Sequence, residues 1–346
     1  MKSEGALNPI RWEEDHLVLI DQRKLPLTES YEKITTLEQC HDAIKVMVVR
    51  GAPCIGFTAI FGMALFAKNE SQIDDTKLKI AAAFLKSARP TAVNLAFEVD
   101  RCVDLILSDP KSAFDRLVSF GQEQMEKAYH ENLSMAETGL KELTARYGDK
   151  KLRLMTHCNT GHLACGCLGT ALGVISHSFK KGAVEKVWVD ETRPYLQGTR
   201  LSSFELWKES IPHQVVVEGA ASELMRQGLV DAVFVGADRI VKNGDTANKV
   251  GTATLAITAK NYGVPFYVIA PTSSFDMASS CGEEIEIEMR PEEEVLSIQG
   301  VRLAAEGVSA YNPSFDITKS EFITGIISEK GIAKGNYVEE IEKFFR

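Results

Sequence analysis

The chain has 346 residues, of which 45% are hydrophobic and 25% are charged. At about 150 residues per domain, this length favours two domains, each with a core of its own. The formal net charge is −9, and the sequence has no Lys- or Arg-rich tract of the kind that follows a nucleic-acid backbone. We therefore expect no nucleic-acid partner.

The amino terminus and the cysteines indicate the compartment. Residues 1–16 carry charges and a tryptophan where a signal peptide has an apolar segment, which argues against export. Two uncharged stretches, residues 51–67 and 161–179, approach the length of a membrane span, but their Gly, Ala, Pro and His residues favour core helices. Seven cysteines, an odd number, fit reduced thiols. We expect a cytoplasmic protein with no membrane partner and no disulfides.

The amino-terminal third is predicted to be mainly helical. Thr36 is a typical N-cap residue, and helical spacing of apolar residues recurs after it. The predicted elements are a hairpin and three helices, at residues 10–21, 36–49, 52–67 and 91–107. We expect a first domain over residues 1–120. Higher charge density with helical spacing over residues 110–146 predicts a helical connector.

After Lys151, short apolar runs alternate with helical stretches and with glycine or polar turns. The runs occupy residues 152–156, 187–190, 214–217, 232–235 and 266–269. This alternation is typical of βαβ units and predicts a parallel, doubly wound sheet within residues 121–346. Ligands bind outside the carboxyl ends of such strands. The site candidates are therefore the polar residues that follow the runs: His157, Cys158, Asn159, Glu191, Thr192, Arg193, Glu218 and Asp238.

The segment MTHCNTGHLACGC, residues 155–167, gathers two histidines and three cysteines. Zinc needs three or four converging ligands, whereas Cys165 and Cys167 are expected on nearly opposite sides of a helix that begins near Gly161. The C-x-x-C motif of a redox pair is absent. Cys158 ends an apolar strand shortly before that helix, whose free N–H groups and dipole stabilise a thiolate. We interpret Cys158 as a reactive thiol. A small buried cysteine and a zinc site that includes His162 are the alternatives.

Two further segments suggest anion binding. In VRGAPCIG, Arg50 precedes Gly51, Ala52 and a proline at the start of a predicted helix, which places a guanidinium beside free N–H groups. An exposed arginine at a helix start is the alternative interpretation. Lys249 lies at the beginning of a helix predicted over residues 249–262, where the dipole disfavours a cation unless an anion is bound.

Asp238 follows a buried strand on a Gly-Ala turn, where a partly desolvated carboxylate can act as an acid or base. A helix-capping aspartate is the alternative. The loop DETRPYLQGTRL adds Gln197 among several polar side chains. The motifs G-x-G-x-x-G and G-x-x-x-x-G-K-[ST] are absent, so the sequence does not support a dinucleotide or nucleoside triphosphate ligand.

Eight sequence blocks occur in one order along the chain: VRGAPCIG, SARPTAVNL, THCNTG, ETRPYLQGTRL, VGADRIVKNGDTANKVGT, APTSSFD, NPSFDIT and ISEKGI. Over essentially its whole length the chain resembles the methylthioribose-1-phosphate isomerase family. These are aldose-1-phosphate isomerases of methionine salvage, related to the regulatory subunits of eukaryotic translation initiation factor 2B. The resemblance implies a helical amino-terminal domain with a short antiparallel sheet and a Rossmann-like carboxyl-terminal domain.

The resemblance also implies the site. It assigns the catalytic pair to Cys158 and Asp238, with Asp238 assisting ring opening and Cys158 assisting hydrogen transfer from C2 to C1. It assigns substrate contacts to Arg50, Gly51, Ala52, Arg89, Gln197, Asn248 and Lys249. It further implies a sugar-phosphate substrate, a homodimer and no cofactor.

The chain departs from the family pattern at two strand ends. His162-Leu163-Ala164-Cys165 replaces a run of small residues, and Glu218-Gly219-Ala220-Ala221 replaces an Asp-x-Met-Ala segment. Both departures concern the far end of the sugar more than the reaction. They leave 5-deoxyribose 1-phosphate open as an alternative to 5-methylthioribose 1-phosphate. A non-catalytic subunit of the initiation factor 2B type is the more distant alternative.

Overall fold

The computed structural model describes residues 7–90 and 93–346, and it divides into two compact units. Unit 1 comprises Met1–His130 and Gly161–Gly169, and unit 2 comprises Glu131–Thr160 and Thr170–Arg346. Helix α5 (Ala113–Tyr147) contributes residues to both units, and the domain boundary predicted at residue 120 falls within it.

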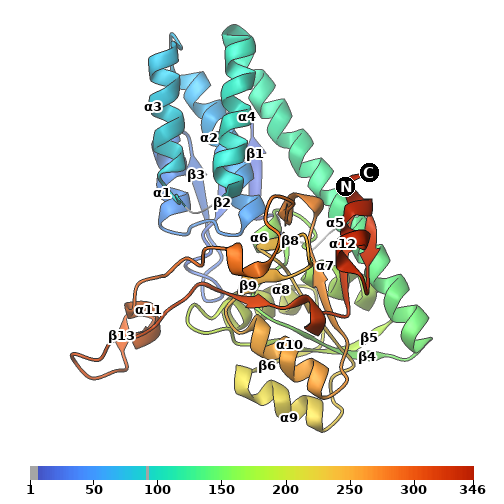
Figure 1. Cartoon of the computed structure of the whole chain (residues 1–346). Coiled ribbons are helices and arrows are strands. Elements are labelled where there is room, and N and C mark those ends of the chain that lie inside the picture. The colour runs from blue at the N-terminus through green and yellow to red at the C-terminus, as the bar shows by residue number, and fades with distance from the viewer. Residues whose placement is uncertain (1–6, 91–92) are drawn as a thin grey trace. The chain divides into compact units, whose positions relative to one another are not determined.

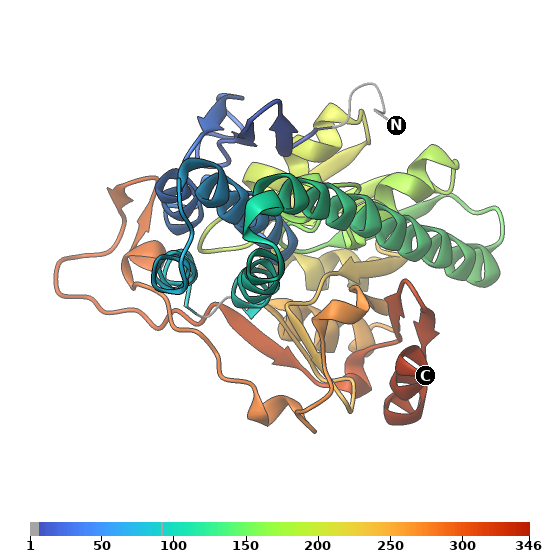
Figure 2. The same ribbon diagram turned by 90° about the horizontal axis from the view of Figure 1, so that it is seen from above.

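Unit 1 combines a small sheet with helices, which confirms the predicted helical domain with a short antiparallel sheet (Figure 1). Its antiparallel strands are β1 (Ile10–Glu13), β2 (His16–Ile20) and β3 (Tyr31–Ile34). Its main helices are α1 (Leu37–Lys45), α2 (Ala52–Asn69), α3 (Asp75–Lys86) and α4 (Val93–Ser108). The start predicted for the last helix, Thr91, lies outside the described residues. Helices α3 and α4 pack side by side and are seen nearly end-on in Figure 2.

Local signals explain the first two helices. The Thr36 side chain accepts a hydrogen bond from the Gln39 N–H, as expected of an N-cap residue at the start of α1. Within the described residues, α2 is the one helix that is long and apolar enough to cross a membrane. It is buried from Cys54 to Leu65. Burial along its length makes α2 the core helix that the sequence predicts.

Unit 2 is built on a seven-stranded sheet with the order β16-β15-β10-β7-β4-β5-β6. Its strands are β4 (Leu152–Thr156), β5 (Val184–Asp190), β6 (His213–Val216), β7 (Ala232–Val235), β10 (Phe266–Ile269), β15 (Gly325–Ser328) and β16 (Gly331–Ala333). All neighbours pair in parallel except β15 and β16. In chain order the parallel strands therefore lie as 3-2-1-4-5-6, the order of a Rossmann sheet, which confirms the predicted class.

The central strands are apolar on both faces. In β7, Val233 and Val235 pack into one apolar cluster, whereas Ala232 and Phe234 pack into another. This alternation follows from the two-residue period of a strand, and it explains why the sequence shows a continuous apolar run. The helices of this unit are α7 (Ala171–Lys180), α8 (Ser203–Lys208), α9 (Ala221–Arg226), α10 (Thr252–Asn261), α11 (Glu293–Leu296) and α12 (Tyr337–Glu342).

A second, four-stranded sheet in unit 2 was not predicted from the sequence. It has the order β11-β8-β9-β14, with β11 (Phe275–Asp276), β8 (Arg239–Val241), β9 (Thr246–Lys249) and β14 (Phe315–Thr318). A short hairpin, β12 (Ser297–Ile298) and β13 (Val301–Arg302), lies between β11 and β14 in sequence. Because β9 pairs with a strand more than sixty residues later, its sequence alone carries little signal of the pairing.

Candidate active site

Cys158 and Asp238 follow two neighbouring strands at the centre of the parallel sheet. Thr156, the last residue of β4, lies opposite Phe234 of β7, and the Thr156 hydroxyl donates to the Phe234 carbonyl over 2.9 Å. Strand order reverses between these two strands. In doubly wound sheets this reversal marks the place where ligands bind, outside the carboxyl ends of the strands. Both residues of the predicted catalytic pair therefore emerge at this point.

The backbone of Cys158 is held in an unusual conformation. Its φ angle is 62°, in the left-handed region that few non-glycine residues adopt. The Cys158 N–H donates to Oγ1 of Thr192 over 2.9 Å, and its carbonyl accepts from Oγ of Ser202 over 2.6 Å. Thr192 is itself at φ 64° and donates its hydroxyl to the Asp190 carbonyl. Side chains from the segment after β5 thus fix the strained turn that carries the thiol.

The helix observed just after Cys158 is much shorter than the predicted one. Helix α6 (His162–Cys165) is a single turn that ends at Gly166, where φ is 78°, and α7 begins only at Ala171. Cys167 therefore lies outside a helix, and the prediction that Cys165 and Cys167 occupy opposite sides of one helix is wrong. Few peptide dipoles add up in one turn, so the expected helix dipole is not available to stabilise a Cys158 thiolate.

His157 lies beside Cys158 in sequence and is fully buried. Its Nδ1 is 3.1 Å from Oδ2 of Asp190, and its Nε2 is 3.0 Å from the Val250 carbonyl oxygen. Desolvation lowers the pKa of His157, but the hydrogen bond and charge of Asp190 outweigh it, and the net pKa is raised. Burial raises the pKa of Asp190. The end of β4 therefore carries a buried acid-base pair directly next to the candidate thiol.

Asp238 is exposed in this structure. Its N–H donates to the Ala247 carbonyl over 2.9 Å, which fixes the backbone of the turn between β7 and β8. The prediction that the Asp238 carboxylate is partly desolvated is therefore wrong for the chain by itself. The side chain starts from solvent, and any exclusion of water around it has to come from what binds there.

Three of the four predicted anion-binding residues of unit 1 lie at the start of α2. Arg50 is buried, and Gly51 is the N-cap residue, with φ 91° and no side chain to cap the helix. A Cβ atom at Gly51 would lie 2.3 Å from the Ala164 carbonyl oxygen, so only glycine fits here. The Leu163 carbonyl accepts hydrogen bonds from Nε2 of Gln22 and Sγ of Cys54. Ala52 begins the helix, and Arg89, after α3, is half-buried.

In unit 2, the turn from β9 to α10 corrects the interpretation of Lys249. Helix α10 begins at Thr252, and the N–H groups of Gly251 and Ala253 donate to the Asp316 carboxylate over 2.7 and 3.1 Å. Lys249 is the last residue of β9, and its Nζ donates to the Ser314 carbonyl. Asp316 already satisfies the helix N-terminus, so the argument that this helix needs an external anion was wrong.

Two amide side chains complete the predicted set in unit 2. Asn248 is buried, and its Nδ2 donates to Oγ1 of Thr252 over 2.9 Å. Gln197 is also buried, and its Oε1 has no hydrogen-bond partner among the described residues. A buried amide oxygen without a donor is costly, so this atom is suited to accept a hydrogen bond from a ligand.

A group of carboxylates lies at the neighbouring strand ends. Oε1 of Glu218, just after β6, accepts the Arg193 N–H over 2.5 Å. Desolvation and the nearby Glu218 raise the pKa of Glu191. The Arg193 guanidinium donates to the carbonyls of Glu294 and Val295. The loop after β5 is thus tied both to the end of β6 and to the chain around α11.

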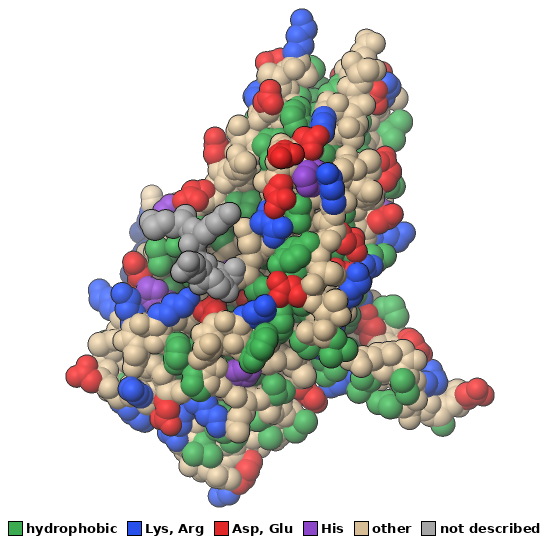
Figure 3. Space-filling model, turned by 180° about the vertical axis from the view of Figure 1, so that it is seen from behind, with side chains coloured by type: hydrophobic (Ala, Val, Ile, Leu, Met, Phe, Trp, Pro, Cys, Tyr) green, Lys and Arg blue, Asp and Glu red, His purple; other side chains and the backbone are tan. Residues whose placement is uncertain are grey.

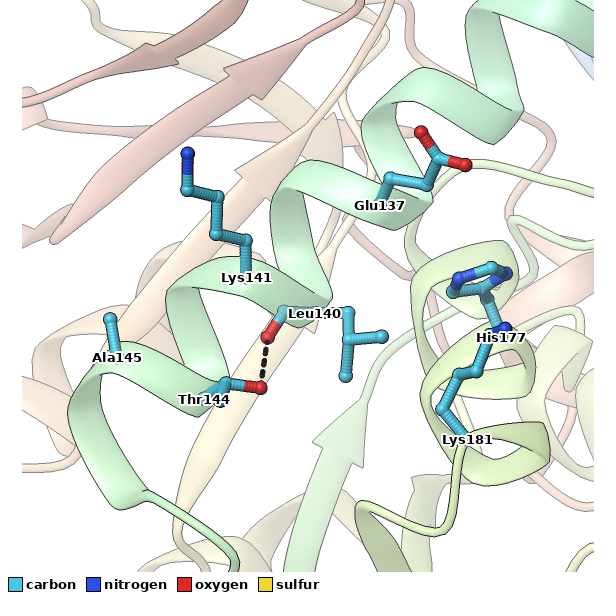
Figure 4. Close-up of a pocket in the computed structure, with 7 residues that line it drawn as sticks. All are labelled: Glu137, Leu140, Lys141, Thr144, Ala145, His177 and Lys181. Atoms are coloured by element: carbon cyan, nitrogen blue, oxygen red, sulfur yellow. Dashed lines mark hydrogen bonds between the residues drawn. The ribbon is translucent and has the colours of Figure 1, made fainter.

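Other surface features do not coincide with the predicted residues. A cavity of about 580 Å³ between α5 and α7 is lined by Glu137, Leu140, Lys141, Thr144, Ala145, His177 and Lys181 (Figure 4). None of these belongs to the predicted site. Figure 3 shows acidic and basic side chains interspersed over the face drawn, without a large patch of one sign.

Sequence reasoning missed several residues that hold the site together. Asp190 ends one of the predicted apolar runs, and Asp316 lies far along the chain from its partners. Glu205 is buried and accepts from Nδ2 of Asn159 over 2.7 Å. A carboxylate within or beside an apolar stretch was the signal that could have identified them, because a buried charge requires a partner.

Comparisons with known proteins agree with this architecture. The model of the initiation factor 2 subunit family matches residues 48–335. Methylthioribose-1-phosphate isomerase of Gloeobacter violaceus is 46% identical over 95% of this chain and 94% of its own length. The crystal structure of 5-methylthioribose 1-phosphate isomerase from Pyrococcus horikoshii superposes with a TM-score of 0.90 at 37% identity, covering 98% of this chain and 95% of that one.

A second solved structure carries a different kind of name. The delta subunit of translation initiation factor eIF-2B from A. fulgidus superposes with a TM-score of 0.88 at 35% identity, covering 98% of this chain and 99% of that one. Curated relatives at 40–46% identity over nearly the whole chain carry the isomerase name. The chain therefore belongs to the initiation factor 2 subunit family and, within it, to the methylthioribose-1-phosphate isomerases.

Proposed function

We propose that this chain converts 5-methylthioribose 1-phosphate to the corresponding ribulose 1-phosphate, with Cys158 and Asp238 as the catalytic pair. The observation that carries the proposal is the position of both residues at the carboxyl ends of β4 and β7, where the strand order reverses. The names of relatives that cover nearly the whole chain support the same reaction.

Ring opening is the first chemical requirement. The phosphate occupies the anomeric oxygen of the sugar, so no carbonyl exists until the bond between C1 and the ring oxygen breaks. An acid has to protonate the ring oxygen as that bond breaks, and we assign this role to Asp238. Because Asp238 is exposed in the chain, the bound sugar has to cover it before a protonated carboxyl is favoured.

Hydrogen transfer from C2 to C1 is the second requirement, and we assign it to Cys158. In one route the Cys158 thiolate removes the C2 proton and the resulting enediol is reprotonated at C1. In the other, hydride moves directly while the thiolate stabilises the positive charge at C1. Turnover in D₂O separates the routes. Deuterium at C1 of early product excludes an exclusively direct shift, and its absence excludes exchange of an abstracted proton with solvent.

The remaining predicted residues are proposed as substrate ligands. Fixed positive charge and N–H donors suit the phosphate, and the set comprises Arg50, the N–H groups of Gly51 and Ala52, Arg89 and Lys249. Gln197 and Asn248 are proposed to bind the sugar hydroxyls. The Gln197 Oε1, which has no donor among the described residues, supports this assignment.

A product assay tests the proposal. Purified chain is incubated with the aldose 1-phosphate, and formation of the ketose 1-phosphate is followed by ³¹P and ¹H NMR. Cys158→Ser and Asp238→Asn should abolish turnover while retaining the circular dichroism spectrum. Cys281→Ser, at a half-buried cysteine far along the chain, is the control that should keep wild-type turnover. Binding of the substrate without product would support a non-catalytic subunit instead.

A second substrate, 5-deoxyribose 1-phosphate, is proposed as the alternative because the chain departs from the family pattern beside Glu218. The departure from the family pattern falls at residues 218–221, and Oε1 of Glu218 is engaged with the backbone of Arg193, in the same loop as Gln197. Specificity constants for 5-methylthioribose 1-phosphate, 5-deoxyribose 1-phosphate and ribose 1,5-bisphosphate, measured side by side, assign the group at C5.

Two further properties are proposed with the function. Light scattering is expected to give twice the mass of the chain, since the family resemblance implies a homodimer. We also propose that the enzyme acts in the cytoplasm, where its cysteines stay reduced.

A further inference from the structure

The buried pair of His157 and Asp190 is not used by the proposed chemistry, yet it lies next to the thiol. The His157 side chain is 0% exposed and the Asp190 side chain 1%. His157 comes directly after β4, and Asp190 is the last residue of β5. The side-chain contact continues the pairing of these strands, in which Thr156 lies opposite Val189.

Three successive ties join the ends of β4 and β5. The first is the backbone pairing of Thr156, the second is the hydrogen bond of His157 Nδ1 to Asp190 Oδ2, and the third is the Cys158 N–H to the Thr192 hydroxyl. Cys158 is strained, with φ at 62°, and persists in that conformation because the ties around it are intact. Losing the second tie removes the side-chain contact directly before Cys158 and leaves its turn held by fewer contacts.

The other side of the imidazole holds a different segment. His157 Nε2 donates to the Val250 carbonyl, while the N–H of the same peptide unit, on Gly251, donates to Asp316. This peptide is thus clamped from both sides. It follows Asn248 and Lys249 directly, so His157 links the Cys158 turn to the two predicted substrate ligands of β9.

Gly251 makes this contact possible. A Cβ atom at Gly251 would lie 2.9 Å from Cε1 of His157, and φ here is 103°. The Cε1–Nε2 edge of the ring therefore lies close to the Gly251 backbone, where a side chain would not fit without displacement. Such a close approach fixes the position of the imidazole as well as its hydrogen bonds.

One proton lies between Nδ1 of His157 and Oδ2 of Asp190. Because Nε2 donates to a carbonyl, Nδ1 either donates to a carboxylate or accepts from a carboxylic acid, and the pair is net neutral in both arrangements. Other ionisable groups that interact with the pair include the carboxylates of Glu191, Glu218 and Asp316. Burial raises the pKa of Asp316.

Such a pair is a poor source of stability. Oδ1 of Asp190 is buried without a hydrogen-bond partner among the described residues. Two apolar side chains of similar volume would fill the same space without that desolvation cost. Apolar side chains could not, however, make directional contacts to two separate segments, as the pair of His157 and Asp190 does.

We propose that His157 is a positioning residue, held by Asp190, that sets the Cys158 thiol in place relative to Asn248 and Lys249. This inference rests on the proposed function, since it assumes that these residues act on one substrate. His157 itself takes no part in proton or hydride transfer to the sugar.

Variants of the pair separate its two contacts. His157→Gln places an amide near the former Nε2 and can keep the Val250 contact while losing Asp190. His157→Asn places the amide near Nδ1 and does the reverse. Asp190→Asn can donate its amide N–H to a neutral Nδ1 and keep both contacts, whereas Asp190→Ala keeps neither the donor nor the acceptor.

A matched control exists in unit 1. His41 is buried, its Nδ1 is 3.1 Å from Oδ1 of Asp42, and its ring stacks on Phe84. His41→Gln removes a similar buried histidine contact outside the proposed site. It should lower thermal stability without changing the chemistry of Cys158.

Two readouts are measured in the same set of proteins. The first is kcat and KM for isomerisation. The second is the rate of Cys158 alkylation by iodoacetamide between pH 6 and 9, with the label located by peptide mapping. His157→Gln and Asp190→Ala should lower kcat roughly 10- to 100-fold, the effect of a misplaced reacting group, and shift the alkylation profile. His157→Asn should mainly raise KM, and Asp190→Asn should restore both readouts.

The alkylation profile keeps this test separate from the test of function. If the wild-type chain makes no ketose, the proposed isomerase fails, and the profile alone decides whether His157 positions the thiol. The proposal is overturned if His157→Gln and Asp190→Ala share the wild-type profile, even with lower thermal stability. It is also overturned if Asp190→Asn behaves like Asp190→Ala.

Discussion

The N–H of Cys158 donates a hydrogen bond to Oγ1 of Thr192 over 2.9 Å, and both residues have left-handed backbones. A β-branched residue such as Thr192 rarely adopts a positive φ, so two strained residues support each other at the ends of adjacent strands. The Thr192 hydroxyl donates in turn to the Asp190 carbonyl. This contact is the most direct structural support for the thiol.

Thr192→Val tests that support, because valine keeps the shape of the side chain and loses the hydroxyl. The Cys158 N–H then loses the Thr192 hydroxyl as an acceptor, which should cost about 1–3 kcal/mol in the free energy of unfolding measured in urea. We expect kcat to fall roughly tenfold or more as the turn relaxes. Thr192→Ser keeps the hydroxyl and should stay near wild type. Equal activity of the valine and serine variants would contradict this role.

Gly251→Ala should disturb the site through His157. The added methyl group would meet the imidazole at 2.9 Å and impose a strained φ, with an expected loss of about 1–3 kcal/mol of stability and a clear loss of activity. Gly263 is the matched control, since its φ is 68° and nothing lies within 4 Å of an added Cβ. Gly263→Ala should cost roughly 1–2 kcal/mol and leave kcat unchanged. Similar losses of activity in both variants would show that backbone strain, and not the contact with His157, causes the loss.

Asp21 should make unit 1 sensitive to acid. Burial raises its pKa, but hydrogen bonds and charge from Arg23 and Lys24 outweigh burial and lower the pKa from 3.8 to about 2. Because the pKa is lower in the folded state, ionised Asp21 stabilises the fold at any pH above its pKa in the unfolded chain. This stabilisation is lost as the pH falls through the pKa of the folded state. This shift corresponds to about 2 kcal/mol. The difference in unfolding free energy between wild type and Asp21→Asn should shrink by that amount between about pH 5 and pH 2. A difference that stays constant over that range would contradict the prediction.

Gln197→Leu should weaken substrate binding more than it slows the chemistry. Its Oε1 is buried without a donor among the described residues, and leucine removes that acceptor while filling a similar volume. If Oε1 accepts from a sugar hydroxyl, KM should rise roughly tenfold, the value of one hydrogen bond, at similar kcat. Because the orphan oxygen disappears, thermal stability should not fall. An unchanged KM would remove Gln197 from the substrate ligands.

The parallel sheet was predictable because its central strands are buried on both faces. Residues 232–235 are an uninterrupted apolar stretch, and residues 152–156 are apolar except for Arg153 and Thr156. Each run matches an observed strand end to end. The polar residues after these runs then identify one edge of the sheet. Cys158 and Asp238 are two of these polar residues, and they follow β4 and β7.

Other parts of the fold depend on contacts with distant segments and could not be predicted from the local sequence. The strand β9 has the polar sequence TANK, and it forms because β14 pairs with it across a long stretch of chain. The same pairing moves Lys249 from the predicted helix start to a strand end. By contrast, Gly166 was a local signal for the early end of α6 that the prediction missed, since glycine readily adopts the left-handed conformation found there.

The role of His157 could not be predicted from the types of residue around it in the sequence. His157 lies in a segment with three cysteines and a second histidine, for which a zinc site that includes His162 was one alternative. Both ring nitrogens of His157 are engaged instead, by Asp190 and Val250. The partners come from positions 190 and 250, which no local pattern connects.

The most direct test of the account is turnover of 5-methylthioribose 1-phosphate by the purified chain, followed by ³¹P NMR. We expect the aldose 1-phosphate signal to be replaced by that of the ketose 1-phosphate in the wild type. Turnover should be lower by about 10³-fold or more in both Cys158→Ser and Asp238→Asn. A wild-type chain that makes no ketose from this sugar or its 5-deoxy analogue would contradict the account, as would wild-type rates in either variant.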